Sequence, residues 1–161
     1  MLELRATALA ILANTDAQQK VSQLLQLFDE YQLHHVTLDL SCKFDDQDLR
    51  LPGRPVKPQL VLPKLVPKRR MDTLEGRTGL LHSLAHIEFN AMNLALDAIW
   101  RFPDMPDSYY QDWLLVAKEE SYHFSLLNNH LHSLGYQYGD FPAHNSLWEM
   151  VEKTKDDVLA R

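Results

Sequence analysis

Two long helical segments, each with a glutamate in its apolar stripe, constrain this chain most. The first reads LLHSLAHIEFNAMNLALDAIW and contains Glu88, and the second reads DWLLVAKEESYHFSLLNNHL and contains Glu120 with His123 one turn later. Because residues three and four apart share a helix face, both glutamates fall on the stripe expected to face the core. Glutamate is rarely fully buried unless it is paired or bound to a metal. The pattern therefore predicts a paired or metal-bound carboxylate on each helix.

The spacing of these residues favours metal ligation. A Glu on one helix that faces a Glu-x-x-His on the next is half of the ligand set of a dinuclear carboxylate centre. Glu88 is followed by small residues that leave room for an ion, whereas Glu119 falls on another face. Carboxylate oxygens together with imidazole nitrogen suit iron or manganese better than calcium or structural zinc. Pairing of each glutamate with an arginine or histidine remains the alternative, and we interpret His82 and His86 as supporting or interface residues.

The remaining segments predict further helices around this pair. Apolar spacing indicates two helices within the first thirty or so residues, the second capped by Thr15 or Asp16 and extending through Tyr31. The two long helices are expected from about Thr73 or Leu74 to Trp100 and from about Ser108 to Leu134, closed by Gly135. Ser146-x-x-Glu149 matches a capping box and predicts a third helix that is still running at Arg161, as in a chain cut short. The apolar positions expected to face the core from the first two helices are Leu4, Ala8, Ile11, Leu12, Val21, Leu24, Leu25 and Phe28.

A proline-rich, basic stretch separates the two groups of helices. Five of the eight prolines lie within 51–67, and eight of the sixteen basic residues lie between Arg50 and Arg77. Proline removes an amide donor and disfavours helix before it. We therefore expect residues 50–72 to form an extended arm over a single domain of residues 1–161, with Val61 and Leu62 docking onto it.

Composition narrows the class of protein. The net charge of −6 argues against a DNA-binding protein, although the basic arm leaves an RNA partner open. The single cysteine, Cys42, fits a reducing compartment. No stretch approaches the ~18 apolar residues that span a bilayer, and Glu3 is unlike the start of a signal peptide. These features predict a cytoplasmic protein without a membrane partner.

The two helical segments and YGDFPAHNSLWEMVEKTKDDVLAR resemble a ferritin-like family of uncharacterised bacterial proteins, domain of unknown function 455. The GRPVKP sequence is similar to the lead-in of that family. The resemblance implies an all-α, ferritin-like helical bundle with a carboxylate-bridged dinuclear site, whose ligands here would be Glu88, Glu120 and His123. Members of the family continue with further core helices that carry another Glu and a second Glu-x-x-His. A more distant similarity links the family to ferritin-like tRNA hydroxylases, which use two irons to activate dioxygen.

The resulting functional expectation is an oxygen-activating oxidase or hydroxylase with iron or manganese as cofactor. Its substrate would be an unknown small molecule or RNA. One chain supplies only three ligands, which leaves two interpretations. The sequence is either a truncated product that folds partly and binds metal poorly, or one half of a homodimer in which a second copy completes the dinuclear site. The alternative is a non-catalytic metal-binding or protein-interaction module with a vestigial half-site.

Overall fold

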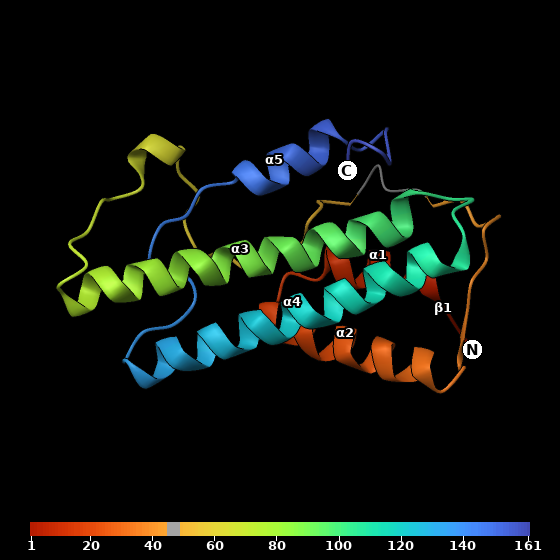
Figure 1. Cartoon of the computed structure of the whole chain (residues 1–161), viewed down its shortest axis with the longest axis horizontal. Helices are drawn as coiled ribbons and strands as arrows, with labels where there is room; N and C mark the ends of the chain where they lie inside the picture. The colour runs from red at the N-terminus through yellow and green to blue at the C-terminus, as the bar shows by residue number, and fades with distance from the viewer. Residues whose placement is uncertain (45–48) are drawn as a thin grey trace.

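The computed structural model describes residues 1–44 and 49–161, and its architecture is mostly helical. Two helical hairpins pack against each other, with α1 on α3 and α2 on α4. Figure 1 shows α3 and α4 side by side along the long axis, with the fifth helix following one edge of α3. No helix in the described part of the chain combines the length and apolarity needed to cross a membrane. The helices are α1 Leu4–Ala13, α2 Ala17–Gln32, α3 Leu74–Arg101, α4 Asp107–Ser133 and α5 Ser146–Lys153.

The first hairpin confirms two N-terminal helices. The Asp16 carboxylate accepts a hydrogen bond from the Gln19 amide at 2.9 Å and caps α2, which satisfies one of the free amides of its first turn. The predicted core positions of α1 are buried. In α2 the inclusion of Leu25 was wrong, because Leu25 is 39% exposed and Leu27 is 1% exposed. Packing of α2 against both α1 and α4 sets a helix phase that turns Leu27 inward.

A short parallel sheet corrects the all-α prediction. The strands β1 (Leu2–Glu3) and β2 (Val36–Thr37) pair with Leu2 opposite Val36. Two-residue strands are too short to show an alternating pattern in the sequence. The sheet ties the start of α1 to the chain that leaves α2.

The second hairpin has the boundaries that the sequence predicted within one residue. The Thr73 hydroxyl accepts a hydrogen bond from the Gly76 amide at 3.0 Å and caps α3. Gly135, with φ of 82°, follows the end of α4, in the left-handed conformation that glycine adopts readily. Between the helices, the rings of Phe89 and Phe124 pack with centroids 5.6 Å apart.

The proline-rich segment lies against the helices and forms hydrogen bonds to the chain before α5. Val61 donates to the Ala143 carbonyl at 2.8 Å, and Ala143 donates to the Gln59 carbonyl at 3.0 Å. The backbone of Val61 is thus joined to the chain before α5, whereas Leu62, which was expected to dock beside it, is 58% exposed. A short 3₁₀ helix, η1 (Pro63–Leu65), interrupts the extended conformation.

The C-terminal segment differs from the predicted continuous helix. Asn145, not Ser146, is the residue before α5, so the capping box prediction was wrong. The helix ends at Lys153 rather than continuing to Arg161, because the Thr154 hydroxyl donates to the Met150 and Val151 carbonyls and the chain turns back. Arg161 then pairs with the fully buried Asp97 of α3, a carboxylate that needs such partners.

Two buried histidines of α3 hold the segment that follows α4. His82 Nε2 accepts a hydrogen bond from the Gly139 amide at 2.8 Å, and His86 Nδ1 lies 2.8 Å from the Tyr138 hydroxyl. The ring of Tyr138 stacks on His82 at a centroid distance of 5.4 Å. Burial lowers the pKa of both histidines to about 4. For His82, the charge of the neighbouring His86 is the second cause of the lower pKa. Both side chains are therefore neutral in the folded protein near pH 7.

A buried lysine ties three parts of the fold together. Lys20 is fully buried on α2, and its Nζ donates to the Leu12 carbonyl at 3.0 Å, the Gly53 carbonyl at 2.8 Å and Asn93 Oδ1 at 2.7 Å. Burial, followed by the charge of Arg54, lowers the pKa of Lys20 to about 7. Three oxygen acceptors nevertheless match the three N–H donors of an ammonium group. This side chain fixes the proline-rich segment against α1, α2 and α3.

We predict that Lys20→Met lowers the free energy of unfolding by about 2 kcal/mol or more, because three oxygens lose a buried donor. Denaturant unfolding measures the change. Lys64→Met removes an exposed lysine of the same segment and should cost less than about 0.5 kcal/mol. Equal effects of the two substitutions would contradict the role of Lys20.

The histidine pKa values predict a pH dependence of stability. His82 takes up a proton near pH 6.5 in the unfolded chain and only near pH 4 in the folded one. Its contribution is therefore complete above pH 6.5 and is lost as the pH falls toward 4, with a slope of up to about 1.4 kcal/mol per pH unit. In His82→Asn, the slope measured by denaturant unfolding should be shallower between these pH values. The control His34→Asn, at an exposed histidine, should keep the slope of the unchanged protein.

Candidate metal centre

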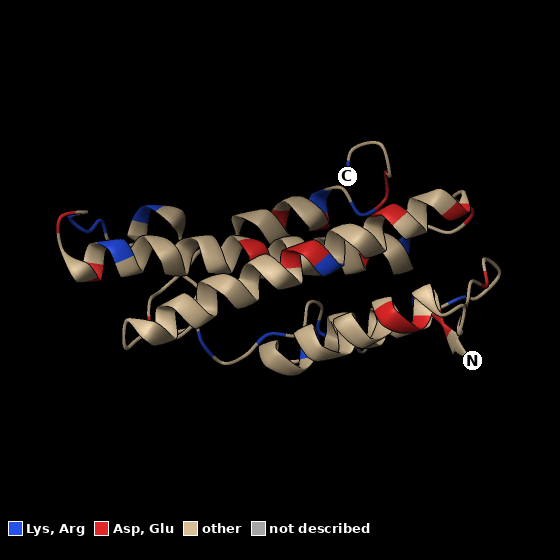
Figure 2. Ribbon diagram, turned by 60° about the horizontal axis from the view of Figure 1, so that its bottom comes forward, with Lys and Arg blue, Asp and Glu red and all other residues tan. Residues whose placement is uncertain are grey.

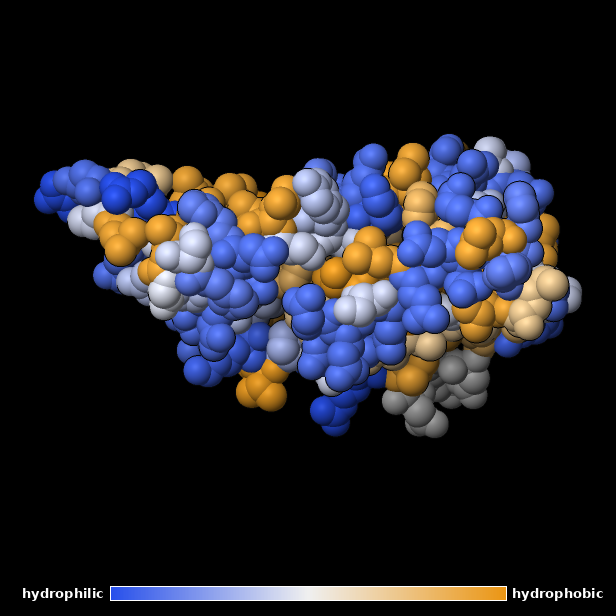
Figure 3. Space-filling model, turned by 90° about the horizontal axis from the view of Figure 1, so that it is seen from below, coloured by the Kyte–Doolittle hydropathy of each residue, from blue (hydrophilic) through white to orange (hydrophobic). Residues whose placement is uncertain are grey.

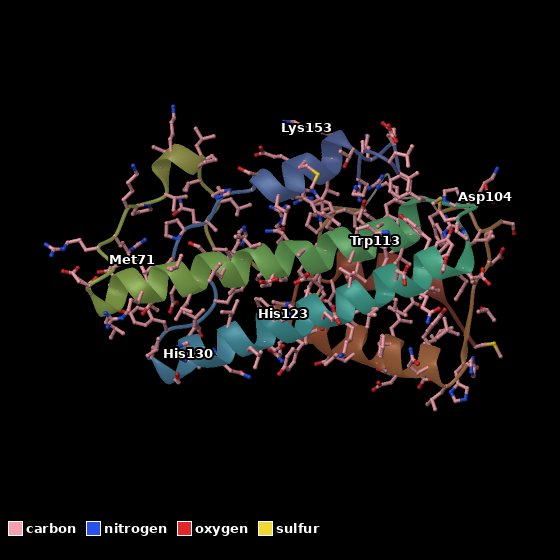
Figure 4. All side chains as sticks on the ribbon, in the orientation of Figure 1. Met71, Asp104, Trp113, His123, His130 and Lys153 are labelled. Carbon is pink, nitrogen blue, oxygen red and sulfur yellow. The ribbon has the colours of Figure 1, made fainter. Side chains whose placement is uncertain are left out.

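The antiparallel α3–α4 hairpin brings Glu88, Glu120 and His123 together. His123 Nδ1 lies 3.2 Å from Glu120 Oε2 and 3.9 Å from Glu88 Oε2. One ligand atom from each residue lies within 4.8 Å of the other two. Figure 2 shows acidic segments of α3 and α4 next to each other near the middle of the hairpin, and Figure 4 places His123 on α4 at this level. The three residues singled out from the sequence thus form one cluster.

The cluster lies at the edge of the helix interface rather than in the closed core. The side chains of Glu88 and Glu120 are each 24% exposed, and that of His123 is 49% exposed. The expectation that Glu88 and Glu120 lie on core-facing stripes was therefore only partly right, because both side chains lie at the boundary of the core. The next residue, Phe89, is 1% exposed and occupies the interior, and a rotation of about 100° per residue leaves Glu88 at the boundary.

The ionisation of Glu88 depends on the neighbouring carboxylate. Partial burial raises the pKa of Glu88 to about 7, with added contributions from a hydrogen bond to Glu120 and from its negative charge, while His123 acts in the opposite direction. A proton shared between the two carboxyl groups relieves their repulsion. A bound cation would relieve the same repulsion.

The donor atoms fit a divalent transition metal. Two carboxylates and one imidazole offer hard oxygen and borderline nitrogen atoms, as iron and manganese sites do. The Nδ1 atom of His123 faces both carboxylates, so this nitrogen is the one positioned for ligation. Ligand atoms on opposite sides of one ion lie about 4 Å apart, given metal–ligand distances near 2 Å. The separations in the cluster are close to that limit.

Exposed apolar side chains surround the cluster, a feature that the sequence reasoning missed. On α3, Leu80, Leu84 and Ile87 are 48%, 38% and 50% exposed. On α4, Tyr122 and Leu126 are 56% and 49% exposed. Neighbouring apolar residues on a helix face indicate a surface that another element covers. The signal in the sequence was that Leu80, Leu84 and Ile87 recur four and three residues apart and so share one face of α3.

Apolar residues also reach the surface elsewhere. Seen from below, Figure 3 shows apolar residues in orange in separate patches among hydrophilic ones. Single exposed apolar residues are common on soluble proteins. The five residues beside the cluster differ because they are neighbours on one hairpin, and we call them the apolar face: Leu80, Leu84 and Ile87 of α3 with Tyr122 and Leu126 of α4.

The other candidate residues lie away from the cluster. Glu119 is exposed on another face of α4, as predicted. His82 and His86 point to the segment before α5 and bond to it, so they hold the chain rather than join the cluster. Among the described residues, no other group of three carboxylate, thiol or imidazole side chains comes equally close together.

Comparisons with known proteins identify relatives but no activity. A family described as "Protein of unknown function (DUF455)" matches residues 13–161. An uncharacterized protein of Haemophilus influenzae (strain ATCC 51907 / DSM 11121 / KW20 / Rd) is 45% identical over 159 residues, which cover 93% of this chain and 55% of the relative. The chain thus spans about half the length of this curated relative, and no solved structure matches it. The family match over most of the chain shows that this protein belongs to the DUF455 family.

Proposed function

We propose that this chain provides part of a ferritin-like, carboxylate-bridged centre for iron or manganese in an oxygen-activating oxidase or hydroxylase. The observation that carries the proposal is the convergence of Glu88, Glu120 and His123 on the α3–α4 hairpin. The family match adds no function, because the family and the Haemophilus protein are uncharacterised. The substrate is proposed to be a small molecule or RNA.

The three residues of the cluster would act as metal ligands with different roles. Glu88 and Glu120 would hold the ions, one of them as a bridge, and His123 would ligate through Nδ1. When bound, a dinuclear centre supplies electrons to dioxygen and is restored by a reductant. The neighbouring apolar side chains would exclude water once covered, which strengthens electrostatic interactions at the centre.

We further propose that a second copy of the chain covers the apolar face and completes the centre. Three side chains on one hairpin are too few to enclose two ions, whereas two hairpins around a two-fold axis provide four glutamates and two histidines. The apolar face surrounds the three ligands, so the same contact that brings the second ligand set also buries exposed leucine and isoleucine. In longer relatives, further helices of the same chain could occupy this position.

The metal proposal predicts a selective loss of metal. Purified under anaerobic conditions, the protein should retain iron or manganese, as measured by elemental analysis. Glu120→Ala removes a ligand and should weaken metal binding at least about tenfold, since even the loss of a residue that supports a ligand costs that much. The matched control Glu119→Ala removes an exposed carboxylate from the neighbouring position. The metal content of this variant should equal that of the unchanged protein. Equal retention by both variants would remove Glu120 from the site.

The dimer proposal predicts a change in mass. The unchanged protein should have twice the 18.7 kDa mass of one chain by light scattering. Ile87→Lys places a charge on the apolar face and should give monomers, because an unpaired charge is costly in an interface. Leu62→Lys alters an equally exposed residue of the proline-rich segment and should remain dimeric. A monomeric unchanged protein, or dimers of both variants, would rule out this interface.

A non-catalytic module is the second candidate. The exposed apolar face favours it, since such a surface can bind a partner whether or not the ligands hold metal. The two candidates differ in metal content: an interaction module would keep its association after Glu120→Ala and would contain no stoichiometric metal.

A further inference from the structure

A cavity of about 790 Å³ lies on a part of the molecule that the metal proposal does not use. The start of α2, the proline-rich segment at residues 54–57, the C-terminal half of α4 and the chain after it form its walls. Its volume is within the range of sites for small molecules, about 300–1,000 Å³. Glu88, Glu120 and His123 do not line it. Its polar residues include Arg54, Lys57, Asn128 and His132, and Phe124 and Tyr138 contribute aromatic surface.

Arg54 is the residue of this cavity whose guanidinium group has a buried atom without a hydrogen bond to the described part of the chain. Its Nε atom is buried without a hydrogen bond. Among the residues that the structure describes, no carboxylate lies within ion-pair distance of its guanidinium group. The carboxylate that acts on it, Glu152, does so at longer range and accepts a hydrogen bond from Trp148. Burial consequently lowers the pKa of Arg54.

Among the described residues, no carboxylate forms an ion pair with the cationic groups near Arg54. Lys20 is bonded to three uncharged oxygens, one of which is the carbonyl of Gly53, the residue before Arg54. Lys57, an exposed residue of the same segment as Arg54, adds a second positive charge to the cavity lining. The one carboxylate in the cavity lining, that of Asp16, already accepts from the Gln19 amide. Buried positive charge is costly unless an anion pairs with it.

We propose that this cavity binds a small organic phosphate, with its phosphate group against Arg54. The planar guanidinium group presents parallel N–H donors that match phosphate oxygens, and Lys57 supplies a second positive charge. Asn128 and His132 offer further polar contacts from α4, while the partly exposed Tyr138 receives the organic part of the ligand. The inference does not depend on the metal centre, because the two sites share no residue.

Calorimetric titration of the full chain with inorganic phosphate, pyrophosphate and succinate, at constant ionic strength, tests this site. Saturable binding of one phosphate or pyrophosphate per chain is expected, with weaker binding of succinate. Arg54→Gln should weaken phosphate binding at least tenfold, and Lys57→Gln should weaken it several-fold. The control Lys64→Gln removes one positive charge from an exposed position of the same segment and should bind as the unchanged protein does.

Three outcomes would overturn the proposal. No saturable phosphate binding would exclude the site, and equal weakening in Lys64→Gln would show a general effect of charge. Succinate binding as tight as phosphate binding would assign the cavity to carboxylates. Circular dichroism checks that Arg54→Gln is folded. If it is not, the phosphate affinities of Lys57→Gln and Lys64→Gln are compared instead, since both replace exposed lysines.

Discussion

The contact between Phe89 of α3 and Phe124 of α4 fixes how the two long helices are rotated. Their rings pack 5.6 Å apart, and both residues are 1% exposed. Tyr138 packs against both rings, at centroid distances of 5.5 Å and 5.1 Å. Because side chains on a helix turn by about 100° per residue, these contacts determine where every other residue of α3 and α4 points.

The position of the candidate centre follows from this rotation. Glu88 precedes Phe89 by one residue and Glu120 precedes Phe124 by one turn, so both carboxylates come to the same edge of the interface. His123, one residue before Phe124, lies on the outer side of the same edge. The same rotation leaves Leu84 and Ile87 exposed beside the ligands. The ligand cluster and the apolar face are therefore two consequences of one packing arrangement.

Local patterns predicted the parts of the structure that depend on neighbours in sequence. Helix limits at Thr73 and Gly135 follow from capping and from glycine conformation, and the spacing of Glu120 and His123 brings both to one side of α4. The course of the chain after α5 involves instead the pairing of Arg161 with Asp97, a contact across 64 residues. The partial exposure of Glu88 depends on packing between helices, which spacing along one helix does not specify.

The cavity near Arg54 also required the structure. In the sequence, Arg54 is one of eight basic residues in a proline-rich stretch, and nothing in its local pattern predicts that it is more buried than Lys64. Its distinction comes from Lys20, which anchors the adjacent Gly53 to α1 and α3 and thereby draws Arg54 into the fold. Tertiary contacts thus turn part of a basic arm into the wall of a cavity.

Native mass spectrometry before and after removal of metal tests the central claim most directly, since it reports mass and bound ions together. If two copies share the centre, the intact protein should carry iron or manganese in a species of twice the 18.7 kDa chain mass. Chelation should then remove the ions and dissociate the dimer into monomers, because the ligands of the two copies no longer share a metal ion. A monomer that holds the same metal per chain, or a dimer that never contains metal, would contradict the account.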